Sequence, residues 1–367
     1  MVTAFKNATL FTGMEVVTGK VLLTEGEYIL GIVSPGAIPD DSVTIDCKGL
    51  NLAPGLIDLQ IAGGGGCLFS SSPTPESLKK IIPAIIKSGT TAFLISLPTN
   101  SFEVYQEAFN TLKNNPDKAV LGLHLEGPYI STSKRGAHIR EMIRKPVRKE
   151  IEDLLTEANG VVRMMTVAPE VCDAEIIDLL INSGLVVAAG HSNATFIEAI
   201  NGFDKGVHTV THLFNAMSPV HHRDPGLPGA AFLSDKVFAS IIADGIHVDY
   251  NMISITKKIM KERLYLVSDA VEENTEGAYK HIRQNDRFIL HDGTLSGAKL
   301  SLFEAVRNCV SYAGIPLEEA LRMASAYPAK VIGDSERGYL TEGCRADLIS
   351  FNDGLELSEV YLGGVPF

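Results

Sequence analysis

The chain has 367 residues, of which 45% are hydrophobic and 21% are charged, a composition typical of a folded soluble protein. Its formal net charge is −12, from 44 acidic and 32 basic residues. Such an acidic chain repels the phosphates of nucleic acids and of anionic membranes, so neither is expected as a partner. Any anionic substrate must therefore meet a local cluster of cationic groups.

The five cysteines are widely separated, and none belongs to a C-x-x-C pair. An odd number of scattered cysteines is typical of reduced thiols, so we expect a cytoplasmic protein. The N-terminus shows no basic segment followed by an apolar core, so we do not expect a signal peptide. No apolar run approaches the roughly 20 residues that a membrane span needs.

Both ends of the chain contain short runs of β-branched and aromatic residues between turn residues. The N-terminal runs are AFKNATLFTG, KVLLTEGEYILGIV and VTIDCKG, and the C-terminal runs are GYLTEG, ADLISFND and VYLGGVPF. Each set reads as strands but is too short to bury a core alone. We therefore predict that residues 1–53 and 336–367 pair into one small β-sandwich domain.

Between these ends, apolar β-type runs alternate with helical segments, which indicates βα units and a parallel sheet. Eight such runs are present: GLIDLQI, TAFLISL, AVLGLHLE, VVRMMTVA, LVVAAGH, VHTVTHL, VFASIIAD and LYLVSDA. The Pro- and Gly-rich segment between LFNAM and VFAS is expected to be a long loop. Eight apolar strands in about 220 residues fit a closed barrel, so residues 54–335 are predicted to form a (β/α)8 barrel of the TIM type.

Polar side chains stand at or near the ends of six of these runs. They are Gln60 in the first run, Glu126 in the third, His191 in the fifth, His212 in the sixth, Asp244 in the seventh and Asp269 in the eighth. Such groups are costly in an apolar strand unless they are paired or coordinated. Because the C-terminal ends of barrel strands form the active-site face, we expect these side chains to converge.

Two histidines and one carboxylate are a standard ligand set for a catalytic zinc ion. Glu126, His191 and His212 can supply that set, and Asp269 would then activate a water as general base. Taken singly, a strand-end His is more often hydrogen-bonded structure, and a strand-end carboxylate is often a helix cap. Their joint placement after successive strands favours a metal site.

Three side chains in loops are further candidates for contacts with a substrate. His138 follows the third run and can donate a hydrogen bond to a developing oxyanion. Arg223 lies in SPVHHRDPGLPG, and its planar guanidinium suits phosphate. His247 lies just past the seventh run, on the same expected face. Each of them also has an ordinary interpretation as a solvated loop residue.

Seven phrases, in chain order, resemble the N-acetylglucosamine-6-phosphate deacetylases of the amidohydrolase superfamily: LAPGLIDLQ, LHLEGPYI, AGHSNA, THLFNAM, IIADGIHVDY, LVSDA and GTLSG. The resemblance covers nearly the whole chain, including GCRADLISF in the C-terminal β segment. It implies metal-dependent removal of the acetyl group from N-acetylglucosamine 6-phosphate. Glu126, His191 and His212 would bind the one metal ion, and Asp269 would be the proton-shuttling carboxylate. Zinc is the expected ion, with ferrous iron as the alternative, since both accept imidazole and carboxylate.

The resemblance also implies which residues contact the sugar phosphate. In the family the Arg and His that face the phosphate come from the neighbouring subunit; here they would be Arg223 and His247, acting across a homodimer. The predicted substrate contacts are Gln60, Ala137, His138, Asn215, Ala216, Arg223, His247, Leu295, Ser296 and Gly297.

One position departs from the superfamily pattern, which usually places a His-x-His pair after the first strand. This chain has Gln60 and Ala62 there, and neither is a good zinc ligand. The departure resembles the single-metal branch of the family, in which an Asn is expected at position 62.

Two alternatives stay open beside this interpretation. A deacetylase for N-acetylgalactosamine 6-phosphate would use the same chemistry on a sugar that differs in one hydroxyl orientation. A catalytically silent sugar-phosphate-binding barrel is the other, because superfamily folds also host non-enzymes. Silent barrels usually lose ligands, whereas this chain keeps its complete set of Glu126, His191, His212 and Asp269.

Overall fold

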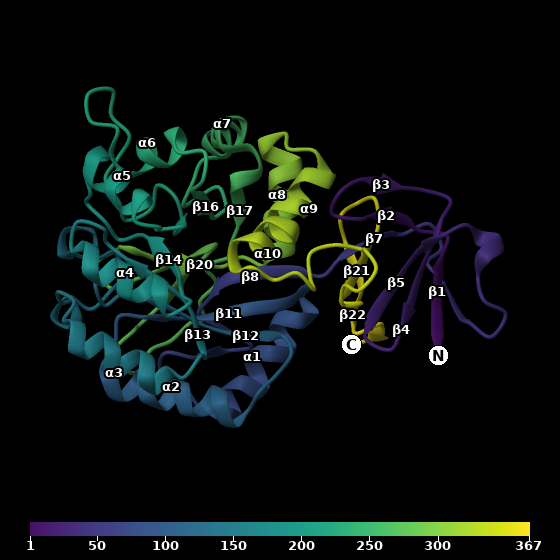
Figure 1. Cartoon of the computed structure of the whole chain (residues 1–367), viewed down its shortest axis with the longest axis horizontal. Coiled ribbons are helices and arrows are strands. Elements are labelled where there is room, and N and C mark those ends of the chain that lie inside the picture. Colours follow the sequence, from purple (N-terminus) through teal and green to yellow (C-terminus); the bar gives the residue numbers. More distant parts are fainter.

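The computed structural model describes all residues, 1–367. Figure 1 shows two bodies beside each other: a barrel surrounded by helices, and a smaller β unit that contains both chain termini. No helix in the chain has both the length and the apolar character that crossing a membrane requires.

The β unit contains two sheets with a shared core. One is built from the N-terminal segment alone, in the order β5 (Tyr28–Val33), β4 (Val21–Glu25), β1 (Val2–Lys6) and β6 (Val43–Asp46). The other joins both chain ends, in the order β23 (Val365–Pro366), β22 (Leu357–Leu362), β21 (Leu348–Phe351), β7 (Asn51–Pro54), β2 (Thr9–Phe11) and β3 (Val16–Val17). Apolar residues from both ends, among them Leu10, Leu22 and Leu348, form one buried cluster. The predicted sandwich is confirmed; its exact boundaries stay a prediction.

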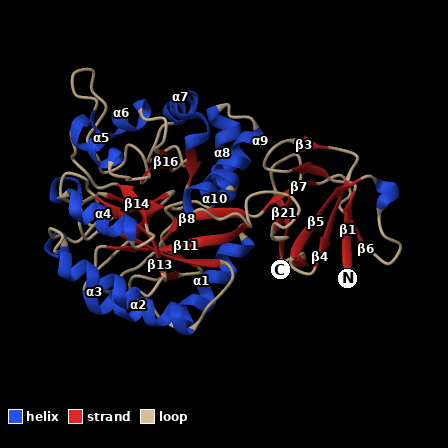
Figure 2. Cartoon of the chain, in the orientation of Figure 1, coloured by secondary structure: helices blue, strands red, loops and turns tan.

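The barrel is one parallel sheet of eight strands, as predicted. In chain order its strands are β8 (Leu56–Ile61), β11 (Thr90–Pro98), β12 (Val120–Glu126), β13 (Val162–Val167), β14 (Val186–Ala189), β15 (Thr209–Val210), β16 (Phe238–Ile241) and β17 (Leu264–Leu266). Most of their residues are buried on both faces, which explains the continuous apolar runs. Figure 2 shows these strands inside a ring of helices.

The first and last strands of the barrel meet at their C-terminal ends. The backbone N–H of Asp269 donates to the carbonyl of Gln60 at 3.0 Å, and that of Ala62 donates to Ala270 at 2.9 Å. A parallel bridge joins Ile61 to Ala270. The barrel is therefore closed beside two of the polar residues that the sequence singled out.

Helices pack around the sheet and bury their apolar faces against it. They are α1 (Pro75–Lys87), α2 (Phe102–Asn114), α3 (Arg148–Ala158), α4 (Ala174–Asn182), α5 (Phe196–Asp204), α6 (Gly226–Leu233), α7 (Tyr250–Met260), α8 (Leu302–Ala313), α9 (Leu317–Ala324) and α10 (Ala326–Ile332). Capping boxes begin α5 at Thr195 and α8 at Ser301, so side chains satisfy the free N–H groups of these first turns.

The expected long loop between LFNAM and VFAS was wrong in part, because residues Gly226–Leu233 form α6. Pro228 lies in the first turn of the helix, where backbone N–H groups have no acceptor within the helix. The missing N–H of proline therefore costs no helical hydrogen bond there. The N–H of Leu227 is satisfied by Ser218 Oγ at 2.9 Å. The buried side chains of Leu227, Ala230 and Ala231 stabilise this helix, although its Pro and Gly content had predicted a loop.

A small antiparallel sheet lies between β17 and α8. Its strands are β18 (Ile282–Gln284), β19 (Arg287–Ile289) and β20 (Leu295–Ala298), and β20 continues into a parallel bridge between Ala298 and Ala270. We call residues 271–298 the flap. Because it leaves and rejoins the barrel next to Asp269, the flap borders the C-terminal end of the barrel.

Candidate active site

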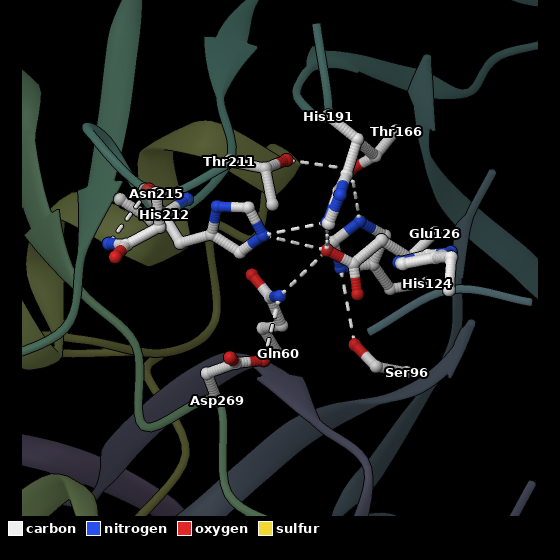
Figure 3. A network of polar contacts seen from close by, with 12 residues as sticks. Gln60, Ser96, His124, Glu126, Thr166, His191, Thr211, His212, Asn215 and Asp269 are labelled. Carbon is white, nitrogen blue, oxygen red and sulfur yellow. Dashed lines mark hydrogen bonds and ion pairs between the residues drawn. The ribbon is translucent and has the colours of Figure 1, made fainter. Parts of the chain in front are cut away.

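Three buried side chains meet at the C-terminal end of the barrel (Figure 3). Glu126 is the last residue of β12, and His191 and His212 each lie two residues beyond β14 and β15. Glu126 Oε1 is 3.0 Å from His191 Nε2 and 2.9 Å from His212 Nε2, and the two nitrogens are 3.1 Å apart. We call these three residues the triad.

The triad has the chemistry of a cation site. The Nδ1 of His191 lies 3.0 Å from the carbonyl of Lys134, which can only accept, so Nδ1 carries the proton. The Nε2 lone pair of a neutral His191 then faces a carboxylate oxygen at 3.0 Å. Two acceptors at that distance repel unless a positive charge lies between them. The three ligand atoms all lie within 4.8 Å of one another, which suits one ion at about 2.0–2.2 Å from each.

The charge balance of the triad supports the same conclusion. Burial opposes ionisation of Glu126, but its contacts with His191 and His212 outweigh burial and hold its pKa well below the usual range. Burial likewise disfavours charge on His212, and the contact with Glu126 overcomes it and raises the histidine pKa. A buried carboxylate thus draws positive charge to this point, which a divalent cation supplies.

Gln60 connects the triad to Asp269. Its side-chain nitrogen donates to Glu126 Oε1 at 3.2 Å and to Asp269 Oδ1 at 2.9 Å. Burial first, and then the negative charge of Glu126, raise the pKa of Asp269 to about 7. A carboxyl group with a pKa near neutrality can both take and return a proton, which suits a general base.

His138 lies beside the triad on the loop that follows β12. Its ring centroid is 4.2 Å from that of His191, and the side chain is buried. Burial, and next the nearby His191, hold its pKa well below the usual range, so the ring is neutral near pH 7. A neutral imidazole in this place can donate one hydrogen bond.

A cavity of about 410 Å³ opens above these groups, within the ~300–1,000 Å³ range of small-molecule sites. The triad residues, Asp269 and His138 all border it. Of the predicted substrate contacts, those that line the cavity are Ala137, His138, Asn215, Ala216, His247, Leu295, Ser296 and Gly297. Gln60 and Arg223 do not line it.

Comparisons with known proteins agree with this geometry. Residues 51–365 match the Amidohydrolase family. The chain belongs to the amidohydrolase family. The N-acetylglucosamine-6-phosphate deacetylase of Haemophilus influenzae is 34% identical over 98% of both chains. An N-acetylgalactosamine-6-phosphate deacetylase from Shewanella sp. is also 34% identical, over 85% of this chain and 82% of that protein.

A solved structure extends the agreement to the fold. The crystal structure of N-acetylglucosamine-6-phosphate deacetylase from Pasteurella multocida matches with a TM-score of 0.95 and 34% identity over 100% of both chains. The resemblance drawn from seven phrases is therefore confirmed. As an amidohydrolase, the chain is a metal-dependent hydrolase.

One candidate metal site is present in the chain. The triad is the single group of three His, Cys, Asp or Glu side chains with ligand atoms close enough to share an ion. Gln60 contacts two carboxylates, and Ala62 lines the cavity beside Leu68 and Tyr279. Gln60 and Ala62, where the resemblance implied the loss of a His-x-His pair, are not among the ligands of this group.

The two predicted phosphate contacts, Arg223 and His247, lie in different parts of the structure. His247 lines the same cavity as the triad of its own chain, and its Nδ1 pairs with Asp244 Oδ2 at 2.6 Å. Asp244, expected to join the other strand-end groups, instead holds the loop that carries His247. Arg223 is exposed, in a turn closed by His221 and Asp224. Within one chain, Arg223 and His247 do not act on the same cavity.

Several cavity-lining residues were missed by the sequence analysis. They are Ser133 and Lys134, before His138, and Tyr279, His281 and Thr294 from the flap. Burial lowers the pKa of His281 to about 4, so this imidazole is neutral. No spacing or motif in EGAYKHIRQ marks Tyr279 or His281, because the flap is placed by its return to the barrel.

The first prediction concerns the metal. We expect His191→Ala or His212→Ala to reduce bound metal from one ion per chain to none, as measured by elemental analysis. Chelation should also lower the melting temperature, because an ion that binds only the folded state contributes about 2.7 kcal/mol at 100 times its Kd. His208→Ala is the control, since His208 packs beside Phe238 outside the cavity. Two ions per chain at full occupancy would contradict the single-metal site.

Proposed function

We propose that this amidohydrolase hydrolyses the acetamide of N-acetylglucosamine 6-phosphate, releasing acetate and glucosamine 6-phosphate. One divalent cation, zinc with ferrous iron as the alternative, would be held by Glu126, His191 and His212. The observation that carries the proposal is the convergence of these ligands with Asp269 and His138 beneath a single cavity. Five free cysteines support a cytoplasmic location.

The chemistry divides between the ion and the chain's own residues. When bound, a divalent cation polarises a carbonyl and lowers the pKa of a coordinated water. Asp269 takes a proton from the attacking water and returns it to the departing amine. His138 donates a hydrogen bond to the acetyl oxygen as negative charge develops there. Gln60 keeps Asp269 beside the triad through its 2.9 Å contact.

The second prediction tests Asp269. Asp269→Asn keeps the shape of the side chain but cannot take and return a proton, so kcat should fall by roughly 10²–10⁴-fold. Metal content and circular dichroism should match the wild type. A variant that keeps more than about a tenth of wild-type kcat would exclude Asp269 as the general base.

The third prediction addresses the sugar. Curated relatives carry both the gluco and the galacto names at the same identity. We expect kcat/KM to be about tenfold higher for N-acetylglucosamine 6-phosphate. In the galacto sugar one hydroxyl has the other orientation and leaves its hydrogen-bond partner in the site unpaired, which costs about that factor. Acetate release from the two sugar phosphates, measured side by side, is the test. A reversed ratio would assign the galacto sugar, and no release from either would favour the silent barrel.

We also propose a homodimer in which Arg223 reaches the cavity of the partner subunit. Lys134 is the only Lys or Arg that lines the cavity, so one chain supplies little charge for a phosphate. Arg223 lies on the loop between β15 and α6, which projects from the barrel (Figure 1). This loop and the helices α6, α7 and α8 carry the exposed apolar side chains Val220, Leu233, Met252, Ile255, Ile259 and Tyr312, a pattern typical of a protein interface.

The fourth prediction tests that arrangement. Arg223→Ala should lower kcat/KM on the phosphorylated sugar by about ten- to a hundredfold, the cost of a charge-assisted hydrogen bond. It should change little on N-acetylglucosamine, which carries no phosphate. Mixing Arg223→Ala chains with Asp269→Asn chains should restore activity, because one site of each hybrid has both groups intact. Failure to restore activity in a proven mixed dimer would place the phosphate contact within one chain.

A further inference from the structure

Thr99 makes two contacts with one ring nitrogen of His138, Nδ1. The backbone N–H of Thr99 lies 3.2 Å from His138 Nδ1, and a backbone N–H can only donate. Nδ1 must therefore accept, so the proton of the neutral ring is on Nε2. The hydroxyl of Thr99 lies 2.8 Å from the same nitrogen and 3.4 Å from the carbonyl of Glu126, so its single proton can be directed to the nearer acceptor, Nδ1. His138 Nε2 makes no hydrogen bond within the protein, and the ring lines the cavity.

Tyr279 of the flap holds the segment around this contact. Its hydroxyl donates to the carbonyl of Thr99 and is also within hydrogen-bond reach of the backbone of Ile139, the residue after His138. Ile139 packs against the small buried cluster to which Tyr279 belongs. The tyrosine is buried, so its contacts are shielded from water. One flap side chain thus touches both the residue that orients His138 and the residue that follows it.

Thr99 has little freedom to move away from His138. A Cβ placed on Gly127 would lie 2.3 Å from Thr99 Oγ1, so the backbone after Glu126 passes directly against this hydroxyl. Gly127 has a φ of +85°, which glycine adopts without strain. The absent side chain at Gly127 therefore leaves the space that the Thr99 hydroxyl needs.

From these contacts we propose that Thr99 and Tyr279 are positioning residues that hold His138 in its Nε2–H tautomer, with that N–H available to the acetyl oxygen of the substrate. The opposite tautomer would set two N–H groups against each other at 3.2 Å. It would also present a lone pair to the substrate carbonyl, which is itself an acceptor. The proposal rests on the proposed deacetylation, in which His138 acts as donor.

The tautomer is tested directly by nitrogen NMR of the zinc-loaded protein labelled with ¹⁵N-histidine. Long-range ¹H–¹⁵N correlations distinguish the two ring nitrogens, and the loss of signals in His138→Gln assigns the ring. We expect a protonated Nε2 and an unprotonated Nδ1. A protonated Nδ1 in the wild type would overturn the proposal. This readout needs no substrate, so it stands even if the sugar phosphate is not hydrolysed, an outcome that refutes the proposed function alone.

The positioning role is tested with matched variants. Tyr279→Phe and Thr99→Val each remove one hydroxyl of a buried side chain, and each should lower kcat by about two- to tenfold, the worth of one net hydrogen bond. KM and metal content should stay near wild type, and Thr99→Ser should restore kcat. Tyr265→Phe is the control, because this buried tyrosine pairs with Thr209 away from the cavity.

The variants separate positioning from a general loss of packing. If Tyr265→Phe lowered kcat as much as Tyr279→Phe, or if Thr99→Ser failed to restore what Thr99→Val lost, the positioning role would be wrong. An unchanged kcat in both Tyr279→Phe and Thr99→Val would overturn it equally. Circular dichroism and melting temperature identify any variant that fails to fold. For such a variant the NMR measurement on the wild type decides.

Discussion

The arrangement of the site depends on one oxygen atom, Glu126 Oε1. It lies in the interior at the end of β12 and is contacted by His191, His212 and Gln60, which come from or follow three other strands. A buried carboxylate is tolerated only when it is paired or coordinated. The residues at the ends of the neighbouring strands must therefore place hydrogen-bond donors, or ligands of a shared cation, at the same level of the barrel. The closure of the barrel between Gln60 and Asp269 satisfies the same requirement, because it places the proposed base next to that oxygen.

The chain adopts unfavourable backbone conformations to meet this requirement. His191, His212 and Asp269 have φ angles of +45°, +31° and +49°, in the left-handed region that residues other than glycine rarely adopt. Each such residue costs on the order of 1–3 kcal/mol and persists only where the surroundings enforce it. The barrel core, a cluster of 81 buried residues, enforces it here. The three residues occupy equivalent places, just beyond a short strand, where the chain must turn the side chain inward before continuing into a loop.

The barrel and the triad could be predicted from the sequence for an identifiable physical reason. Burial on both faces gives parallel strands a continuous apolar run, and a polar residue that ends such a run is conspicuous. The same reasoning failed for α6, where tertiary burial of Leu227 and Ala230 outweighed the local signal of Pro and Gly. It also missed Tyr279, whose partner Thr99 is 180 positions away in the sequence. Contacts of that kind depend on where the flap returns to the barrel, and no local pattern encodes that position. The substrate contacts came from the family resemblance and not from spacing.

The remaining constraint is electrostatic. The cavity already contains the carboxyl groups of Glu126 and Asp269, and burial lowers the pKa values of His138 and His281, so these two rings add no positive charge near pH 7. Asp244 is held ionised beside His247, since contacts with that histidine outweigh the burial of the carboxyl group and lower its pKa. Lys134 alone is a permanent cation in the lining. A metal ion would offset the carboxylates of the triad and Asp269, but a phosphate bound in this cavity would meet one lysine only. In the proposed dimer, the exposed Arg223 of the second subunit would add the missing positive charge.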